Sequence, residues 1–245
     1  MIRLLSIFAL VALIACDAPV QMAPAAPPAG IVSPAGPAPG AFSIRQGASA
    51  PQNRASFEAL VQRMEPVLER ECRSRAPALN CDFSIRLYGD PRLPPNAFQT
   101  LDETGRPILG FTAALIEDVR NADELAFVLG HEAAHHIAGH LARQAQNASL
   151  GAAIFGALAA QTGAGADGVQ SAQELGAAVG ARSYSKDFEL EADRLGTVLT
   201  ARAGFDPLVG AAYFMRIPDP GNRFLGTHPP NAERIAIVEA TAATL

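Results

Sequence analysis

The chain has 245 residues, of which 19 are lysine or arginine and 24 are aspartate or glutamate, so its net charge is −5 at pH 7. This balance provides no basic surface of the kind that binds nucleic acid, so that class of function is excluded. The sequence also contains neither a glycine-rich phosphate loop nor a nucleophile elbow, which argues against phosphate-loop chemistry and serine proteolysis.

Residues 1–15 have the pattern of a secretory signal peptide. Arg3 supplies a positive charge, and the apolar run from Leu4 to Ala15 is shorter than the roughly twenty residues that a membrane-spanning helix needs. The run ends in Leu13-Ile-Ala-Cys16, which resembles a bacterial lipobox. We therefore expect Cys16 to become a lipidated N-terminus that anchors the protein in the periplasm, to either the inner or the outer membrane. The alternatives are an ordinary cleaved signal and an uncleaved anchor, each with an incidental cysteine.

Residues 16–53 are predicted to form a linker. No charged residue occurs between Asp17 and Arg45, and proline, alanine and glycine dominate that stretch. Such a segment lacks the large apolar side chains that would offset the entropy of ordering, and its prolines favour extended conformations. We expect it to hold the folded part, residues 54–245, away from the membrane. That part is long enough for one domain with a single core.

The folded part is predicted to begin with a helix and a small sheet. Apolar residues from Ser56 to Arg75 recur at helical spacing, although Pro66 can kink or split this helix. Residues 82–89 alternate apolar and polar side chains as a half-buried strand does, and residues 97–101 and 107–114 form a strand pair across a short turn. If the edge strand borders a cleft, an unfolded substrate can pair with its backbone with little sequence preference.

Cys72 and Cys81 remain as a pair once Cys16 is assigned to lipid. In an oxidising compartment we expect a disulfide between them, which would join a helix end to a strand. The alternative is a pair of buried thiols that only pack. Zinc binding by these cysteines is not expected, because their spacing matches no zinc-finger pair.

His131, Glu132 and His135 form an HExxH motif within residues 122–146, a run that is expected to be one amphipathic helix. Residues four apart lie one turn apart on the same face of a helix, so both imidazoles can converge on one zinc ion. The glutamate then lies beside the metal and can take a proton from water that the metal has acidified, which is the chemistry of amide hydrolysis. The alternative is a pair of core histidines that only satisfy hydrogen bonds.

A zinc hydrolase needs a third protein ligand, with water in the fourth position. The glycine and the histidine that follow the motif are each one place away from the metzincin pattern, so the remaining candidates are acids in a predicted helix within residues 183–197. Glu189 and Asp193 are four residues apart. One can therefore bind the metal while the other accepts a hydrogen bond from the second ring nitrogen of a ligand histidine. Glu191 points about 200° away from Glu189 around the helix, and we expect it to be solvated.

The HExxH motif followed by Glu189-Leu-Glu-Ala-Asp193 resembles the HtpX-like and CAAX-prenyl-endopeptidase family of zinc metalloproteases. Asn96-Ala-Phe98 resembles that family's segment before the edge strand, and Thr227-His228-Pro229 with Arg234 resembles its C-terminal segment. His140 matches the extra histidine after its zinc helix. The resemblance covers nearly all of the folded part. It implies an α+β fold, mainly helical and of zincin type, with a small sheet beside the zinc helix.

The resemblance also implies a role for each matching residue. It implies that the zinc ligands are His131, His135 and Glu189. It also implies that Glu132 is the general base and that Asp193 and Arg234 support the ligands. His228 is implied either to donate to the developing oxyanion or to block the site at rest, and the sequence does not choose between these roles. His136 and His140 lie off the ligand face, so they are expected to support the site or to pack.

Residues 148–181 are poor in charge and rich in alanine and glycine. Small residues permit close helix packing, so we expect a helical hairpin packed on the domain, with a mobile flap or a membrane-facing element over the cleft as the alternative. Beyond it the sequence predicts a break at residues 204–207, a short helix through Met215 and a final helix that begins near Pro230.

These features predict a lipid-anchored, extracytoplasmic metalloendopeptidase with one zinc ion per chain. The compartment and the resemblance point to misfolded or mislocalised envelope proteins as substrates. The alternative is a lipoprotein on a protease-like scaffold that captures unfolded envelope proteins without cleaving them. The oligomeric state is not predicted.

Overall fold

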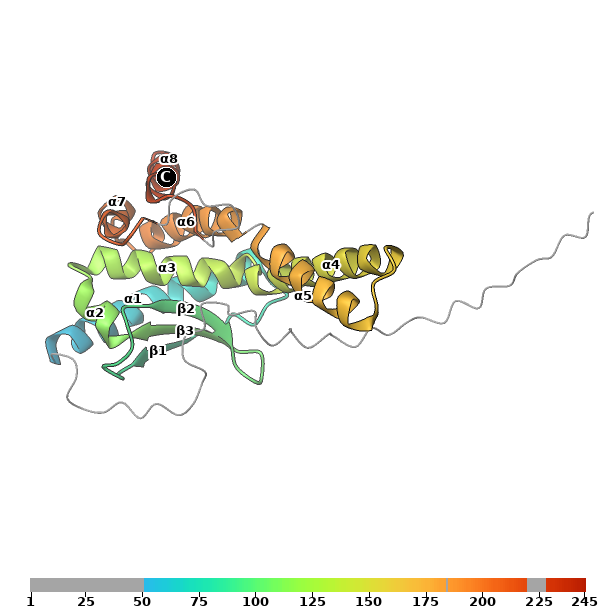
Figure 1. Cartoon of the computed structure of the whole chain (residues 1–245). Coiled ribbons are helices and arrows are strands. Elements are labelled where there is room, and N and C mark those ends of the chain that lie inside the picture. Colours follow the sequence, from blue (N-terminus) through green and yellow to red (C-terminus); the bar gives the residue numbers. More distant parts are fainter. Residues whose placement is uncertain (1–50, 184, 220–227) are drawn as a thin grey trace, which may run out of the picture.

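The structure is a computed structural model that describes residues 51–183, 185–219 and 228–245 (Figure 1). The expected signal peptide and Cys16 lie outside the described residues. The elements in chain order are α1 (Pro51–Arg75), β1 (Ser84–Tyr88), β2 (Ala97–Leu101), β3 (Pro107–Thr112), α2 (Ala113–Asp118), α3 (Ala122–Ile137), α4 (His140–Gln161), α5 (Ala166–Ser183), α6 (Ser185–Arg202), α7 (Pro207–Ala211), the 3-10 helix η1 (Ala212–Met215) and α8 (Asn231–Ala242). Helices dominate and one small sheet is present, which confirms the expected α+β fold.

Helix α1 is a single helix that begins within the expected linker and contains Pro66 in its interior. The helix is not split, because Met64 and Leu68 are fully buried in the core and hold both halves in place. Pro66 lies on the exposed side, as does Gln62, whose carbonyl loses its helical partner and can bind water instead. Tertiary packing therefore outweighs the local cost of the proline.

The three strands form one sheet in the order β1-β3-β2. Strand β3 is buried along its whole length, and it pairs in parallel with β1 and antiparallel with β2. The expected hairpin between β2 and β3 is confirmed. Strand β3 ends at Thr112, two residues earlier than expected, because the Thr112 hydroxyl accepts a hydrogen bond from the backbone N–H of Leu115 and caps α2. Strands β1 and β2 are therefore the two edge strands of the sheet.

Helix α3 lies at the centre of the molecule, between the sheet with α1 on one side and α6 with α7 and α8 on the other (Figure 1). Leu125 and Leu129 of α3 are buried in the main core, and Phe127 packs edge-on against Phe214 on the side of α8. Burial on both sides explains why α3 is more apolar than a surface helix.

Helices α4 and α5 form a hairpin that projects away from the body of the molecule (Figure 1). Their backbones touch, since a Cβ atom added to Gly151 would lie 2.0 Å from the carbonyl oxygen of Gly176. The expected hairpin is thus confirmed, but it packs mainly on itself, and only its base meets the domain. Leu150, Ile154 and Leu158, one turn apart along α4, are exposed. No described helix is long and apolar enough to cross a bilayer.

Candidate metal centre

Helix α3 carries the HExxH motif and ends just after it. Its N-terminus is capped by Asn121, whose side-chain oxygen accepts a hydrogen bond from the backbone N–H of Glu124. The expected single helix over residues 122–146 is wrong, because Gly139 adopts the left-handed conformation (φ 66°) and separates α3 from α4. Glycine takes this conformation without the steric cost of a Cβ atom. The turn brings His140, the first residue of α4, back toward the motif.

Helix α6 approaches α3 closely enough to bring its acids to the histidines. A Cβ atom added to Gly196 would lie 3.0 Å from the backbone nitrogen of His131, and one added to Gly130 would lie 2.9 Å from the Thr200 hydroxyl oxygen. Two glycines therefore set the separation of the two helices. Two turns before Gly196, Glu189 faces the HExxH motif.

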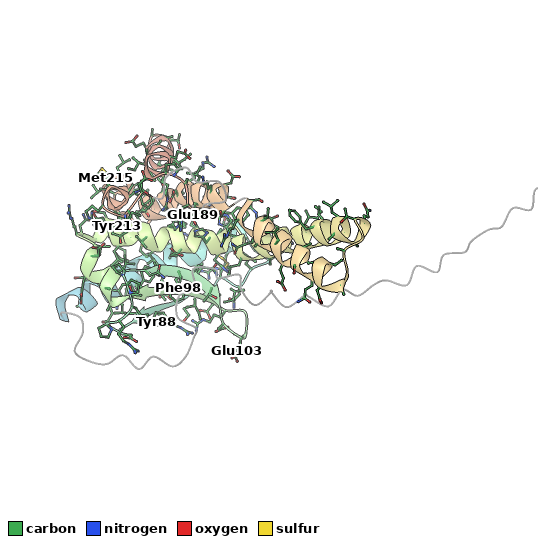
Figure 2. The ribbon with its side chains drawn as sticks, viewed as in Figure 1. Tyr88, Phe98, Glu103, Glu189, Tyr213 and Met215 are labelled. Atoms are coloured by element: carbon green, nitrogen blue, oxygen red, sulfur yellow. A yellow bond between two sulfur atoms is a disulfide. The ribbon has the colours of Figure 1, made fainter. Side chains whose placement is uncertain are left out.

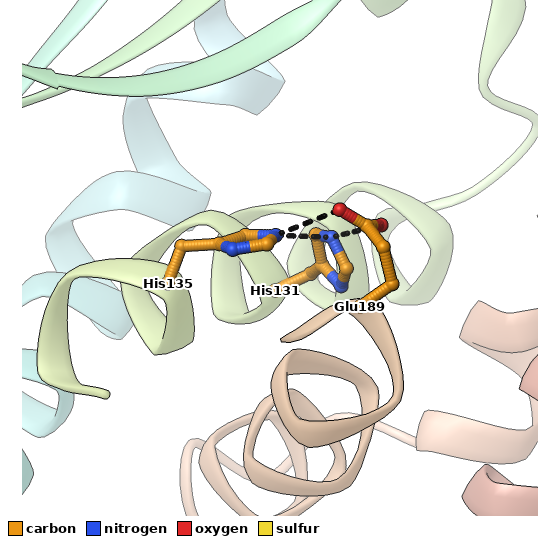
Figure 3. Close-up of side chains that lie close together, drawn as sticks. All are labelled: His131, His135 and Glu189. Atoms are coloured by element: carbon orange, nitrogen blue, oxygen red, sulfur yellow. Dashed lines mark hydrogen bonds and ion pairs between the residues drawn. The ribbon is translucent and has the colours of Figure 1, made fainter. Parts of the chain in front are cut away.

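His131, His135 and Glu189 bring three potential ligand atoms together (Figure 3). The Nε2 atoms of the two histidines are 3.0 Å apart, and each lies 3.5 Å from a different carboxylate oxygen of Glu189. Zinc bonds of about 2.0–2.2 Å in tetrahedral geometry place neighbouring ligand atoms about 3.3–3.5 Å apart. The donor set and its spacing therefore fit one divalent zinc-like ion with one position left open.

The charges around the two rings also favour a cation between them. Burial opposes a charge on His131, but hydrogen bonds with Asp193 and Glu189 raise its pKa to about 10. Burial and the neighbouring His131 lower the pKa of His135 to about 3. Two imidazoles whose Nε2 atoms lie 3.0 Å apart can share only one positive charge, and a bound metal ion can take the place of the shared proton.

The ring nitrogen of His131 that faces away from the cluster contacts a buried ion pair, Asp193 and Arg234. This Nδ1–H donates to an Asp193 oxygen 2.9 Å away, and Arg234 donates to both oxygens of Asp193 at 2.7 Å. Asp193 is fully buried, and the Arg234 guanidinium also stacks 3.8 Å above the ring of Phe214. Burial opposes ionisation of Asp193, but the hydrogen bonds from His131 and Arg234 lower its pKa. Such an arrangement fixes the ring orientation of a ligand histidine.

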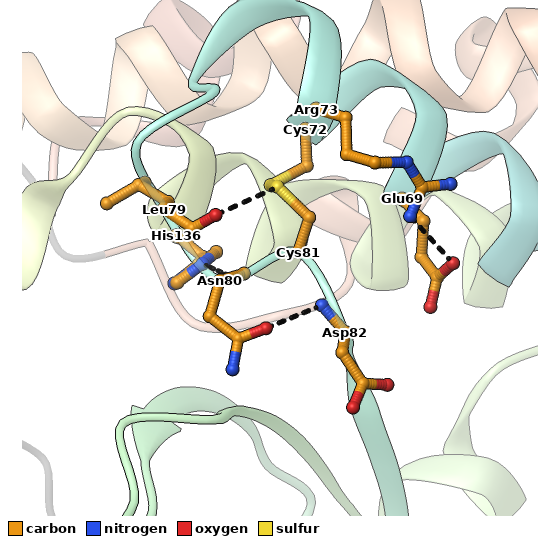
Figure 4. Close-up of a disulfide and its surroundings, with 8 residues drawn as sticks. All are labelled: Glu69, Cys72, Arg73, Leu79, Asn80, Cys81, Asp82 and His136. Carbon is orange, nitrogen blue, oxygen red and sulfur yellow. Dashed lines mark hydrogen bonds and ion pairs between the residues drawn. A yellow bond between two sulfur atoms is a disulfide. The ribbon is translucent and has the colours of Figure 1, made fainter.

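His136, by contrast, points away from the cluster. Its Nε2–H donates to the carbonyl oxygen of Asn80 at 2.8 Å, and its ring packs edge-on against Phe83. Asn80 belongs to the loop that a disulfide between Cys72 and Cys81 joins to the end of α1 (Figure 4). His136 thus connects α3 to this loop and has the packing role that was expected of it.

Glu132 and His228 lie close to the cluster and line the same cavity as the three candidate ligands. Burial raises the pKa of Glu132 to about 7. Nδ1 of His228 is 3.2 Å from a Glu189 oxygen, which is ion-pair distance, but the angle is not that of a hydrogen bond. Burial opposes ionisation of Glu189, yet contacts with His131 and His228 hold the pKa of this carboxyl well below its ordinary range. His228 therefore lies beside the candidate ligands without being one of the three.

A cleft of about 370 Å³ opens onto the cluster. Residues of the edge strand β2, including Phe98 and Gln99, line one wall, while Phe214, Ile217 and His228 line the other side. Figure 2 shows Phe98 on the sheet side of α3 and Glu189 on the α6 side. Edge strand β2 therefore borders the cleft, which is the arrangement on which backbone pairing with an unfolded substrate depends.

Two residues near the cluster were not assigned a specific contact by the sequence. Glu191 keeps 43% of its side chain exposed, so the expected solvation is incomplete: its carboxylate also pairs with His140 and Arg143. His140 in turn contacts His135. The sequence signal for the contact between His140 and His135 is Gly139, which lies one turn after the motif and favours the left-handed conformation that ends α3.

Two histidines one turn apart, an acid from a second helix and a half-buried glutamate beside them are the arrangement of a metallopeptidase site. Residues 59–242 match peptidase family M48, and the chain belongs to this family of zinc metalloproteases, which confirms the predicted family. The chain is similar to the beta-barrel assembly-enhancing protease of Yersinia pestis, with 30% identity over 141 residues, 51% of this chain and 28% of that protein. It is also similar to the mitochondrial metalloendopeptidase OMA1 of Saccharomyces cerevisiae, with 29% identity over 169 residues, 62% of this chain and 45% of that protein. The chain thus spans less than half the length of either relative.

Proposed function

We propose that this protein is a zinc-dependent metalloendopeptidase. One observation carries the proposal: His131, His135 and Glu189 bring three ligand atoms within 4.8 Å of one another, with Glu132 on the same helix as the two histidines. The His₂Glu donor set is that of zinc peptidases, and the motif has its glutamate beside the first ligand. Membership of peptidase family M48 supports the same activity.

Glu132 is the proposed general base. A zinc ion bound by the three ligands would acidify water and polarise the scissile carbonyl. The Glu132 carboxylate takes the proton of the attacking water and passes it to the departing amine nitrogen. Burial raises the pKa of Glu132 to about 7 in the metal-free protein, and the charge of a bound zinc ion would favour the carboxylate form that accepts the proton. His228 lies beside Glu189 at the cleft, where its ring can donate to the oxyanion that develops on the carbonyl.

The proposed substrates are unfolded or misfolded envelope proteins. An extended chain can lie in the cleft and pair with the exposed backbone of β2, a mode of binding that demands little of the substrate's sequence. The names of the relatives link them to β-barrel assembly and to mitochondria. In the proposed organisation, residues 1–15 are the signal and Cys16 carries the lipid. The linker leads into α1 at Pro51, and the peptidase domain lies in a bacterial periplasm.

The proposal is tested by replacing Glu132 with glutamine. The chain from Asp17 onward, which lacks the predicted signal and lipid site, would be incubated with an unstructured protein, and fragments would be measured together with bound zinc. We expect wild type to cleave, and Glu132→Gln to bind one zinc per chain and to lose at least 100-fold in rate, because proton transfer by a placed group contributes about 10²–10⁴-fold.

Glu103→Gln is the matched control, because Glu103 is exposed in the turn between β2 and β3 and faces away from the cleft (Figure 2). It should cleave at the wild-type rate. Equal cleavage by wild type and Glu132→Gln would overturn the assignment of the base. Zinc binding without any cleavage would favour the second candidate, a latent binding lipoprotein, for which the contact of His228 with Glu189 is the supporting observation.

A further inference from the structure

The ring nitrogen of His135 that faces away from the cluster contacts another histidine, His140, and not a carboxylate. Nε2 of His135 faces His131 and Glu189, and its Nδ1 lies 2.8 Å from Nδ1 of His140. On the far side of the His140 ring, Nε2 lies 3.2 Å from a carboxylate oxygen of Glu191. The three side chains thus form a chain of contacts that runs from the candidate metal position to the surface of α6.

The chemistry of these groups fixes the direction of both hydrogen bonds. A carboxylate only accepts, so the proton of a neutral His140 resides on Nε2, which donates to Glu191. Nδ1 of His140 is then an acceptor, and Nδ1–H of His135 donates to it. This leaves Nε2 of His135 without a proton and free to bind a metal ion.

The position of His140 is itself fixed on several sides. Its ring stacks on Phe188 with the centroids 4.6 Å apart and the planes 11° apart. Arg143 donates to Glu191 at 2.6 Å and covers the same phenyl ring with its guanidinium at 4.3 Å. Glu191 and Arg143 are each 43% exposed on their side chains, so water screens the charge pair, and its contribution is orientation more than energy.

We propose that His140 is the positioning residue for the candidate ligand His135, and that Glu191 selects the tautomer of His140 that this role needs. The two ligand histidines are then oriented differently: His131 by a buried aspartate and arginine, His135 by a neutral imidazole backed by a half-exposed acid. All three acids of the segment from Glu189 to Asp193 serve the site under this assignment. The proposal rests on the proposed zinc site.

The test measures zinc affinity by competition with a chelator, using the chain from Asp17 onward, and the visible spectrum of the Co²⁺-loaded protein. His140→Phe keeps a ring against Phe188 but removes both hydrogen bonds. We expect it to bind zinc about 10–100-fold more weakly, as loss of a partner of a metal-bound histidine does, and to change the Co²⁺ spectrum. His140→Asn, whose amide oxygen can accept from His135, should recover part of the loss.

Glu191→Gln should weaken zinc binding less than His140→Phe, because the ring stays in place but its preferred tautomer is no longer enforced. Asp187→Asn is its matched control, because Asp187 is an exposed acid of the same helix, and it should bind zinc as wild type does. The melting temperature of the metal-free variants separates the two effects, since a purely structural role would lower stability and leave the zinc affinity of the folded protein unchanged.

The outcomes separate this proposal from the proposed function. If wild type binds no zinc, the zinc site itself fails. If wild type binds zinc, and His140→Phe and Glu191→Gln bind it with the same affinity and give the same Co²⁺ spectrum, the positioning role is overturned. Should His140→Phe fail to fold, Glu191→Gln decides alone, because its side chain is half exposed.

Discussion

Asp193 is fully buried between His131 and Arg234, so its charge is stabilised by the hydrogen bond from His131 and the ion pair with Arg234 and not by water. Removing one partner of such a pair leaves the other charge buried without compensation, which costs about 3–5 kcal/mol. We therefore predict that Asp193→Asn lowers the free energy of unfolding of the metal-free protein by about that amount at pH 7. Urea unfolding of the two proteins measures the difference.

The same pair makes a prediction about pH. The pKa of Asp193 is lowered below its ordinary value of 3.8, so the unfolded chain binds the proton more readily than the folded protein does. The stability from Asp193 is therefore complete above about pH 4 and is lost as the pH falls through the folded-state pKa. The difference between wild type and Asp193→Asn should shrink in this acid range. A difference that stays constant through this range would contradict the assignment.

Glu191 illustrates what a residue's spacing predicts and what it does not. Its direction around α6, away from Glu189, follows from helical geometry. Its partners do not, because His140 and Arg143 come from α4, about 50 residues earlier in the chain. Helical geometry predicts that an acid on the outer face of a helix is solvated. Glu191 contacts the site only because α4 packs beside α6 and brings His140 and Arg143 to it.

Helices α3 and α6 are the two elements that must meet for the site to exist, and Gly196 sets their distance. A Cβ atom there would lie 3.0 Å from the backbone nitrogen and 3.1 Å from the Cα atom of His131, and neither backbone atom can move without moving the ligand. We predict that Gly196→Ala weakens zinc binding at least several-fold and destabilises the fold by about 1–3 kcal/mol, the usual cost of overpacking. Zinc competition and urea unfolding measure both effects.

Gly168→Ala provides a control of opposite sign. Gly168 is an exposed residue in the first turn of α5, where an added Cβ atom would meet only the exposed Ala164 side chain, at 3.1 Å. Alanine reduces the entropy of the unfolded chain, so this variant should gain about 0.4–1 kcal/mol if Ala164 moves aside, and it should bind zinc normally. A Gly196→Ala protein that is stabilised in the same way would show that the helices are not in close contact there.

At the scale of the whole molecule, a metal ion would join two helices that lie far apart in sequence. Because the ligand atoms converge only in the folded protein, zinc binds the native state, and free zinc at 100 times its dissociation constant stabilises it by about 2.7 kcal/mol. For a domain of this size we expect removal of zinc by a chelator to lower the melting temperature by about 5–10 °C.

Calorimetry with and without chelator measures this shift. His135→Ala, which lacks one of the three ligands, should melt at nearly the same temperature in both conditions. An equal shift in His135→Ala and wild type would place the stabilising metal elsewhere. The projecting α4–α5 hairpin should not affect the result, because it packs mainly on itself and contributes little to the main core.

Local patterns were enough to predict the sheet hairpin, a helix that carries the motif but not its end at Ile137, and the Ala/Gly hairpin. They also placed Glu189 and Asp193 opposite the histidines, whereas the choice of Glu189 as the ligand came from the family resemblance. Periodicity and spacing predict the structure of a single segment, and residues four apart on a helix lie on the same face. Three features required the tertiary structure: α1 running unbroken through Pro66, the projection of α4 and α5 from the body, and the contact of Glu191 with His140. Each depends on which segments pack against one another, and the free energy of that packing comes from residues far away in the chain. The residue types of the site were thus readable from the sequence, whereas their partners were decided by how α3, α4 and α6 meet.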